Sequence, residues 1–391
     1  MQVQNARTLR SYLDIIAGSE QLESRLWTPE DDCQKAELHR QIFMNLVQGY
    51  LQLLGGEPDT PDFTPIYNNH LLLQPNPDDT YVHTPVNGKG VYRLSGDRGT
   101  ICLLTITLVK QLIGSSETPG GQTAEYDLDD AIALNADGTF DCLLSDVRPQ
   151  GYEGNWLHMP ADTDGYLIRR RAYDWVNERD PRLAIERLDV SPLRPRPTRA
   201  QIEAKLTALA EFAERHSRQW LQYQEQLLPL VNRIENHGFT DLGGIRVQQY
   251  WWGKFDIEPG EALILETEVP VAAPYWNIQL NDQLWNTLEY AWRQSHLNGH
   301  QARIDSDGRF RAVISSDDPG VPNWLDTVGR LQGSIVGRWY KCSSNPLPQI
   351  TKVPLTEVRR HLPDDTPVVT SAERADSIRA RARAIQMRTR W

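Results

Sequence analysis

The chain has 391 residues, which exceeds the usual size of one domain and predicts two or three. Its formal net charge of −11 argues against a nucleic-acid or anionic-membrane binder, because phosphate contacts need clustered Lys and Arg. The polar start carries no secretory signal, and no apolar run reaches the length of a bilayer span. The four cysteines are scattered without a C-x-x-C pair, which is typical of reduced thiols, so we expect a cytoplasmic location.

The N-terminal segment, residues 1–57, is expected to hold two helices. Apolar residues recur at spacings of three and four near residues 7 to 26, which indicates the first helix. Thr28 as a cap and Pro29 at the first helical position predict the start of the second. Its apolar residues extend to Leu54, and Gly55 with Gly56 ends it. We expect this helix to pack on a neighbouring domain.

From residue 58 the chain becomes rich in proline and in short β-type runs, which predicts a first β-sandwich over residues 58–190. A proline-rich linker then leads into a helical connector, residues 191–240. A second β region follows over residues 241–355. Asp137-Gly138 and Asp307-Gly308 each predict a hairpin turn. No internal repeat is evident in the sequence. These segments together predict a fold that is mainly β with helical segments.

The last segment, residues 356–391, is a basic tail that we expect to be helical. Its arginines fit a solvated face, but with an acidic body the tail can also dock on its own chain or on a second copy. A homo-oligomer is therefore a candidate assembly. The tail arginines are Arg379, Arg381, Arg383, Arg388 and Arg390.

Several motifs resemble a pair of families known as domains of unknown function, numbered 1254 and 1214. The Asp307-Gly308 turn, Asn323-Trp324-Leu325 and Arg338-Trp339-Tyr340 resemble the 1214 pattern over the last third of the chain. Asn76 to Tyr81, with one residue shifted, resembles the 1254 pattern within residues 60–190. The resemblance implies an immunoglobulin-like first sandwich, a helical connector and a jelly-roll second sandwich. It implies little about activity, because both families are named for the lack of a known one.

A first candidate site follows the first helical region. In an extended segment Asp79, Tyr81 and His83 point to one face, since side chains alternate with period two. A carboxylate, a phenol and an imidazole close together can form an acid/base relay. Asn69 and His70, a little earlier in the chain, are candidate substrate contacts. The alternative is a loop that prolines and Asx-turns hold in shape.

A second candidate is the pair His296 and His300. Their spacing matches a zinc-binding helix, but that motif also needs a glutamate between the histidines and a third ligand. Asn298-Gly299 instead favours a turn. We therefore expect no metal, and we take His296 alone as a candidate catalytic residue that points into a pocket.

A third candidate combines aromatic and amide side chains in the second β region. Trp and Tyr provide flat apolar walls, while amides and Arg supply directed donors, as in a pocket for a ring-bearing molecule. Trp276 and Trp324 are the expected walls. The alternative is a sandwich core with structural tryptophans. The other candidate contacts are Tyr275, Asn277, Asn323 and Arg338.

The sequence has no G-x-G-x-x-G segment before a helix, no P-loop and no G-x-S-x-G elbow, so we expect no cofactor. The hypothesis is a cytosolic, cofactor-independent enzyme: a lyase, isomerase or hydrolase that uses acid/base chemistry. Its substrate would be a hydrophobic ring-bearing molecule such as a terpenoid, steroid or aromatic compound. The alternative is a non-catalytic protein with a lectin-like or partner-binding β-sandwich. An enclosed cavity lined by His, Asp and Trp would favour the enzyme, and a shallow exposed aromatic strip would favour binding alone.

Overall fold

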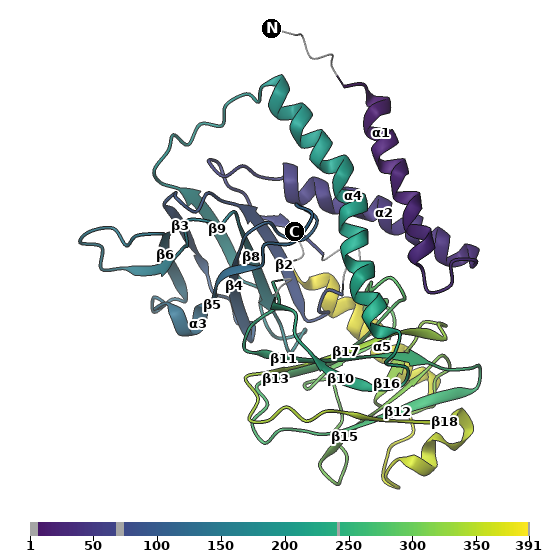
Figure 1. Ribbon diagram of the computed structural model, residues 1–391. Coiled ribbons are helices and arrows are strands. Elements are labelled where there is room, and N and C mark those ends of the chain that lie inside the picture. Colours follow the sequence, from purple (N-terminus) through teal and green to yellow (C-terminus); the bar gives the residue numbers. More distant parts are fainter. Residues whose placement is uncertain (1–6, 68–73, 241–242, 390–391) are drawn as a thin grey trace.

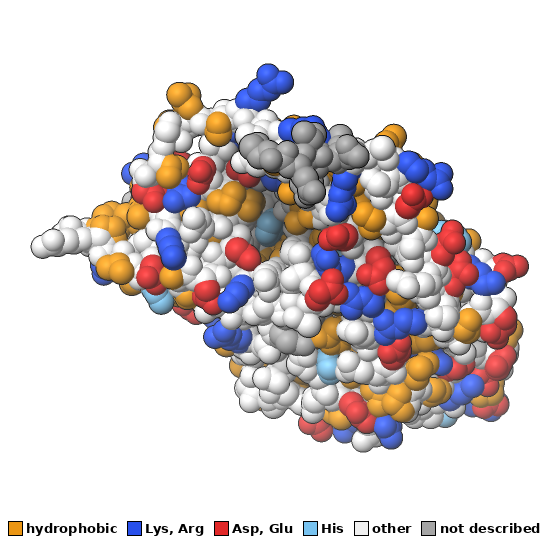
Figure 2. Space-filling view, turned by 45° about the horizontal axis from the view of Figure 1, so that its top comes forward, with side chains coloured by type: hydrophobic (Ala, Val, Ile, Leu, Met, Phe, Trp, Pro, Cys, Tyr) orange, Lys and Arg blue, Asp and Glu red, His pale blue; other side chains and the backbone are white. Residues whose placement is uncertain are grey.

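The computed structural model describes residues 7–67, 74–240 and 243–389. The protein is mainly β, as predicted, with four sheets and a set of helices that connect and cover them (Figure 1). Figure 2 shows acidic and basic side chains interspersed over one face of the molecule. Among the helices of the described ranges, none has the length and apolar character that crossing a membrane requires.

The helices begin and end at residues whose caps can be identified. α2 begins at Asp32, because the Asp31 carboxylate accepts a hydrogen bond from the Cys33 N–H at 2.8 Å. The predicted start at Thr28 is wrong, since its carbonyl closes a turn with the Asp31 N–H at 2.9 Å. α4 begins with a capping box between Thr198 and Gln201. The helical segments are α1 Leu9–Ala17, η1 Gly18–Arg25, α2 Asp32–Leu54, α3 Leu128–Ala131, α4 Arg199–Leu227, η3 Leu355–His361 and α5 Ser371–Met387.

The first β unit consists of two sheets with the strand orders β1-β2-β8-β4-β5 and β7-β6-β3-β9. Apolar side chains from both sheets, among them Leu94, Leu104 and Leu144, fill one buried core between them. The strands are β1 Thr64–Pro65, β2 Asp79–Pro85, β3 Tyr92–Asp97, β4 Leu103–Val109, β5 Gln122–Asp127, β6 Thr139–Ser145, β7 Asn155–His158, β8 Gly165–Arg171 and β9 Arg182–Arg187.

The second β unit has the strand orders β10-β11-β17-β13-β14 and β16-β15-β12-β18. Its core includes Trp251, Trp276 and Trp339 together with aliphatic side chains from both sheets. The strands are β10 Ile234–His237, β11 Gln248–Asp256, β12 Glu261–Glu268, β13 Tyr275–Asn281, β14 His296–Asn298, β15 Arg309–Ser315, β16 Trp324–Asp326, β17 Gln332–Tyr340 and β18 Gln349–Pro354.

The two β units share one topology, strand for strand. In each unit an Asp-Gly turn, whose glycine (Gly138 or Gly308) has a positive φ, comes directly before a strand, β6 or β15. That strand pairs in parallel with a strand, β7 or β16, at whose start the sequence reads Asn-Trp-Leu. β2 and β8 of the first unit thus correspond to β11 and β17 of the second. The expectation of no internal repeat is wrong, and the structure shows the same strand order where the resemblance implied two different sandwiches.

The two units meet along their five-stranded sheets. Tyr81 and Leu167 from the first unit and Tyr250 and Val336 from the second belong to one hydrophobic cluster, with Trp220 from α4 at its side. The cluster places β2 and β8 opposite β11 and β17. The functional site described below lies at this junction.

α2 packs against α4 with an unusual pattern of side chains. It buries Leu38 and Ile42, but further along it buries the polar Asn45 and leaves Phe43 and Tyr50 exposed. Asn45 hydrogen-bonds to Ser217 and His216 of α4 at 2.6 and 2.9 Å. The predicted apolar face is therefore only partly the buried one, because polar pairs between the two helices replace apolar contacts there.

The basic tail docks on its own chain through α5. The Arg388 guanidinium, just after α5, donates hydrogen bonds to the Asp180 carboxylate at 2.7 and 3.0 Å. It also donates to the backbone carbonyls of Asp78 and Arg170, at 3.0 and 2.9 Å. The two side chains of the ion pair are only 2% and 3% exposed.

Replacing Arg388 by alanine is expected to destabilise the protein by roughly 3 kcal/mol, since it leaves the buried Asp180 carboxylate without its partner. Arg379 pairs with Asp376 on the exposed face of the same helix, so Arg379→Ala is the matched control and should change stability by less than about 0.5 kcal/mol. Urea denaturation followed by circular dichroism measures both. Equal effects of the two substitutions would contradict the proposed docking role of Arg388.

Candidate functional site

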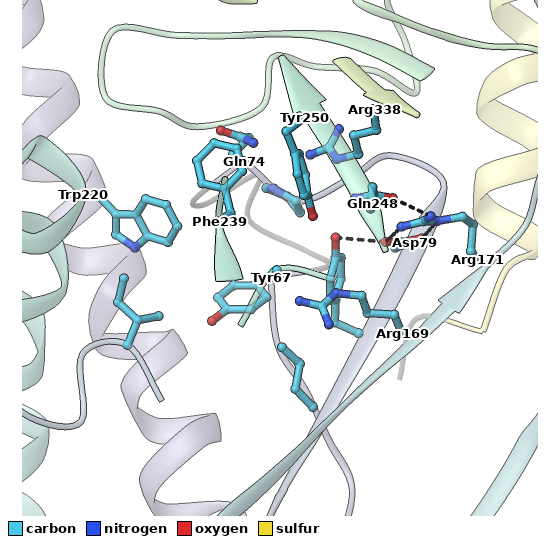
Figure 3. A pocket seen from close by; sticks show the side chains of 15 residues that line it. Tyr67, Gln74, Asp79, Arg169, Arg171, Trp220, Phe239, Gln248, Tyr250 and Arg338 are labelled. Atoms are coloured by element: carbon cyan, nitrogen blue, oxygen red, sulfur yellow. Dashed lines mark hydrogen bonds and ion pairs between the residues drawn. The ribbon is translucent and has the colours of Figure 1, made fainter. Parts of the chain in front are cut away.

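A pocket opens between the two β units, with α4 at one side (Figure 3). Its cavity volume is about 80 Å³. Its lining combines three arginines and one carboxylate with several aromatic rings. The lining residues are Tyr67, Gln74, Pro75, Asp79, Tyr81, Ile113, Leu167, Arg169, Arg171, Trp220, Phe239, Gly244, Gln248, Tyr250 and Arg338. We call it the inter-unit pocket.

Two tyrosine–arginine pairs face this pocket, one from each unit. In the first unit Tyr81 of β2 lies opposite Arg169 of β8, with the guanidinium carbon 5.8 Å from the ring centroid. In the second unit Tyr250 of β11 lies opposite Arg338 of β17, with the same distance at 5.6 Å. Because β2 and β8 correspond to β11 and β17, the two pairs occupy equivalent positions of the repeated fold.

The carboxylate of the pocket is held by a neighbouring arginine. Arg171 donates two hydrogen bonds to Asp79, at 2.6 and 2.9 Å, and a third to the Gln248 side chain at 2.8 Å. Both side chains of the ion pair are almost fully buried. Burial alone would lower the pKa of Arg171, but Asp79 outweighs it and keeps that pKa raised. Arg171 is therefore charged and is held in an ion pair with Asp79.

The other two arginines of the pocket have no carboxylate partner among the described residues. Arg338 donates to the side-chain oxygens of Gln279 at 2.6 Å and Asn277 at 3.3 Å. Arg169 donates to the Thr107 hydroxyl at 2.8 Å and to the backbone carbonyl of Gly243. They are only 4% and 7% exposed, respectively. Buried guanidinium groups held by neutral acceptors keep an uncompensated positive charge, which favours an anion in the pocket.

The Tyr81 hydroxyl lies between the charged groups of the pocket. It accepts a hydrogen bond from the Asn76 N–H at 2.9 Å and donates a long one to Asp79 at 3.3 Å. Burial raises the pKa of Tyr81, Asp79 raises it further, and Arg169 and Arg338 oppose the rise. The phenol is therefore protonated near neutral pH and can act as a hydrogen-bond or proton donor rather than as a base.

Aromatic side chains form the apolar part of the pocket wall. Phe239 contacts the Tyr250 ring edge-on, with centroids 4.8 Å apart. Trp220 from α4 packs against Trp285 at 5.1 Å on the far side of the cluster. In Figure 3 the rings of Trp220, Phe239 and Tyr67 lie on one side, and Asp79, Arg171 and Arg338 lie on the other. The pocket thus has an aromatic end and a charged end, which suits a molecule with a ring and an acidic group.

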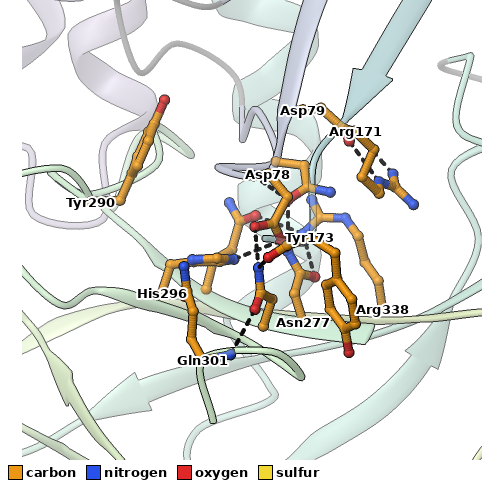
Figure 4. A network of polar contacts seen from close by, with 12 residues as sticks. Asp78, Asp79, Arg171, Tyr173, Asn277, Tyr290, His296, Gln301 and Arg338 are labelled. Carbon is orange, nitrogen blue, oxygen red and sulfur yellow. Dashed lines mark hydrogen bonds and ion pairs between the residues drawn. The ribbon is translucent and has the colours of Figure 1, made fainter. Parts of the chain in front are cut away.

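Behind the charged end lies a fully buried polar network around Asp78 (Figure 4). One carboxylate oxygen accepts hydrogen bonds from Trp175 at 2.7 Å and Asn298 at 2.6 Å. The other accepts from Tyr275 at 2.7 Å and contacts His296 Nε2 at 3.0 Å. Burial would raise the pKa of Asp78, but His296, Tyr275 and Asn298 outweigh it and lower the pKa to about 2. Asp78 is therefore an anchor that joins the two units.

Both ring nitrogens of His296 are engaged in this network. The Nδ1 atom accepts a hydrogen bond from Arg381 at 3.0 Å, so the proton is on Nε2, which faces Asp78. Burial lowers the pKa of His296 against the opposing effect of Asp78, which keeps the imidazole neutral. His296 does not line the inter-unit pocket. In this arrangement it has no free nitrogen for a substrate proton.

The structure distributes the predicted site residues over several places. Asp79, Tyr81 and Arg338 meet in the inter-unit pocket. Tyr275 and Asn277 belong to the Asp78 network. Asn69 and His70 lie outside the described residues.

His83 follows Asp79 and Tyr81 on β2 but is not part of the pocket wall. Its imidazole lies beside the backbone of Gly165, where an added Cβ would come within 2.8 Å of Nε2. His83 is buried, and its Nδ1 atom has no hydrogen-bond partner within the described part of the chain. The predicted one-face arrangement thus brings two of the three side chains to the pocket.

The predicted tryptophan walls lie in hydrophobic cores instead. Trp276 packs edge-on against Phe310 at 4.8 Å inside the second unit. Trp324 belongs to a separate core of that unit, with Arg374 over its ring. Asn323 holds a loop by donating to the carbonyls of Arg303 and Arg311. These placements match the alternative of structural tryptophans, and within the described ranges no three His, Cys, Asp or Glu side chains gather as metal ligands.

Sequence reasoning missed several pocket residues. Arg169 and Arg171 lie two residues apart in a run of three arginines that ends the otherwise apolar strand β8, and such buried arginines are rare without a partner or ligand. That pattern was available as a signal. Trp220, Phe239 and Tyr250 gave none, because they come from separate elements that only the fold brings together.

Comparisons with known proteins identify similar proteins of uncharacterised function. The profile of a family described as "Protein of unknown function (DUF1214)" matches residues 79–175 and 260–344, one segment in each β unit. The predicted 1214 resemblance of the second unit is thereby confirmed. The first unit also matches that profile where the sequence was compared with family 1254, and the 1254 resemblance stays a prediction.

Two solved structures resemble this chain. An uncharacterised protein from Burkholderia cenocepacia is 25% identical, with a TM-score of 0.83 over 89% of this chain and 96% of that one. The VPA0106 protein from Vibrio parahaemolyticus is 11% identical, with a TM-score of 0.47 over 88% of this chain and 100% of that one. No curated protein matches the sequence.

Two buried histidines make stability depend on pH. Burial lowers the pKa of His83 to about 4 and that of His216 to about 3, from an ordinary value of 6.5. Below pH 6.5 these two histidines therefore bind protons in the unfolded chain but stay neutral in the folded one. As the pH is lowered, the free energy of unfolding falls until the pH reaches the pKa of each histidine in the folded protein. Between pH 7.5 and 5 we expect a loss of roughly 2 kcal/mol per histidine.

Urea denaturation at the two pH values measures this loss. His83→Gln and His216→Gln should each reduce the loss of unfolding free energy between the two pH values by the amount that one histidine contributes. His361 is exposed, so His361→Gln should leave that loss unchanged. Full pH dependence in both buried-histidine variants would rule out this origin.

Proposed function

We propose that the protein is an enzyme that binds a small ring-bearing acid in the inter-unit pocket and acts on it by proton transfer. One observation carries the proposal: the buried guanidinium groups of Arg169 and Arg338 line an aromatic pocket without a carboxylate partner among the described residues. An anionic ligand would supply the missing charge, and its ring would lie against Trp220 and Phe239. The earlier hypothesis of a hydrophobic ring-bearing substrate is thereby refined to one that also carries an acidic group.

Tyr81 is the proposed catalytic proton donor, and Asp79 positions it. The hydrogen bond from Tyr81 to Asp79 is long for an O–H···O contact, so a substrate oxygen that develops negative charge can compete for the proton. Arg169 and Arg338 would stabilise the phenolate that remains. Donation of this kind fits lyase or isomerase chemistry in which an enolate-like oxygen forms. We assign no proton transfer to His83 or His296.

The alternative of a lectin-like protein receives less support. Sugar binding by stacking needs tryptophan faces that are open to solvent, and Trp276 and Trp324 are buried in cores. A carrier that binds the same acid without turning it over differs from the enzyme only in the role of Tyr81.

The charge of the ligand can be tested with benzoate and its neutral, isosteric analogue benzamide. We expect benzoate to bind more tightly, and Arg338→Met to weaken benzoate binding about tenfold because a charge-assisted hydrogen bond is lost. Benzamide binding should change little. Isothermal titration calorimetry or saturation-transfer NMR measures both ligands.

Arg379→Met, on the exposed face of α5, is the matched control for these titrations, and Arg338→Lys separates charge from shape. Thermal unfolding by circular dichroism checks that each variant is folded. Equal binding of benzoate and benzamide to the native protein would contradict an anion site.

The catalytic role of Tyr81 can be tested by incubating the protein with a cellular small-molecule extract. We expect the wild type to convert at least one acidic, ring-bearing compound, with the change detected by untargeted mass spectrometry. Tyr81→Phe keeps the ring but loses the donor, so turnover should fall by roughly 10²-fold or more. Tyr126→Phe, outside the pocket, is the control. Conversion that is equal in the Tyr81→Phe and wild-type proteins would leave Tyr81 without this role.

A further inference from the structure

We infer that the ligand carries two acidic groups, one for each tyrosine–arginine pair. This inference rests on the proposed function and names the substrate class more closely as a ring-bearing dicarboxylate. It follows from the repeated fold, from the charges that line the pocket and from one difference between the two halves.

The repeated fold supplies the first argument. Tyr81–Arg169 and Tyr250–Arg338 are cross-strand pairs on equivalent strands, with nearly the same arginine-to-ring distance. Each unit therefore presents the same donor group, a guanidinium beside a phenol, to the space between the units. Two equivalent donor groups, one from each unit, suit a ligand with two acidic groups.

The charges of the lining supply the second argument. Of the three arginines, only Arg171 is paired with a carboxylate of the wall, Asp79. Burial raises the pKa of Glu125, and the nearby Arg169 opposes the rise, but the Glu125 carboxylate accepts hydrogen bonds from the Arg246 N–H, and no ion pair joins it to Arg169 among the described residues. Two guanidinium charges are thus left for the ligand, which is the charge of a dicarboxylate.

The third argument is the difference between the halves. Asp79 lies opposite Arg171 in the first unit, and the equivalent positions of the second unit hold Gln248 and Tyr340. Gln248 accepts a hydrogen bond from Arg171 and offers no charge to Arg338. The second unit therefore lacks both members of the Asp79–Arg171 ion pair, and a neutral amide at position 248 leaves the charge of Arg338 without a carboxylate there.

The experiment compares four small probes by isothermal titration calorimetry: benzoate, phenyl phosphate, isophthalate and terephthalate. The two dicarboxylates place their charges at different separations around one ring, while phenyl phosphate concentrates its charge on one group. We expect at least one dicarboxylate to bind about tenfold or more tightly than benzoate. Arg169→Met and Arg338→Met should each reduce that dicarboxylate to the affinity of benzoate, and the double variant should bind none of the probes measurably.

Arg169→Lys and Arg338→Lys keep the charge and should retain part of the preference, which separates loss of charge from loss of folding. Arg379→Met should change nothing. If phenyl phosphate binds as tightly as the better dicarboxylate and depends on both arginines, the two charges meet one group and the inference is overturned. If benzoate binds through Arg338 but neither dicarboxylate binds better, the inference fails and the proposed function stands. If none of the four probes binds, the proposed anion site itself is refuted.

Discussion

The buried carboxylate of Asp78 is the interaction on which the rest of the structure depends. A charge at this depth is tolerated only with full hydrogen bonding, and its donors come from both halves of the chain: Trp175 from the first, and Tyr275, His296 and Asn298 from the second. These partners therefore hold the two β units together at one point. Any shift between the units would leave some of these groups unpaired inside the protein.

That fixed junction shapes the pocket beside it. Asp79 follows Asp78 directly: Asp78 ends the turn before β2 and its carboxylate enters the network, while Asp79 is the first residue of β2 and lines the pocket. Arg388, just after α5, reinforces the same point by donating a hydrogen bond to the Asp78 carbonyl. The C-terminal helix thus contributes to the geometry of the pocket without lining it.

Much of the fold could be predicted from the sequence, because local signals specify it. The Asp-Gly turns, the end of α2 at Gly55 and the alternating strands depend on neighbours in the chain. The duplication was not visible, since the two units share strand order but few side chains. α2 misled the prediction because buried polar pairs with α4 replaced the apolar contacts that periodicity assumes.

The site was predictable only in part. Asp79 and Tyr81 were found because two residues on one strand share a face, and Arg338 was found through its aromatic neighbours. Trp276 and Trp324 were misplaced, because composition cannot distinguish an indole in a core from one in a pocket. Trp220 and Phe239 reach the pocket through contacts between elements far apart in sequence, which no local pattern encodes.

The covalent union of the two β units has a consequence for how this pocket can vary. Two separate copies of one unit, packed face to face as an isologous pair, would have to present identical walls, because every substitution would appear twice. In a single chain the walls are free to diverge. Position 79 can then hold a carboxylate while the equivalent position 248 holds an amide. The two walls of the cavity therefore differ in charge, and a bound molecule has one preferred orientation between them.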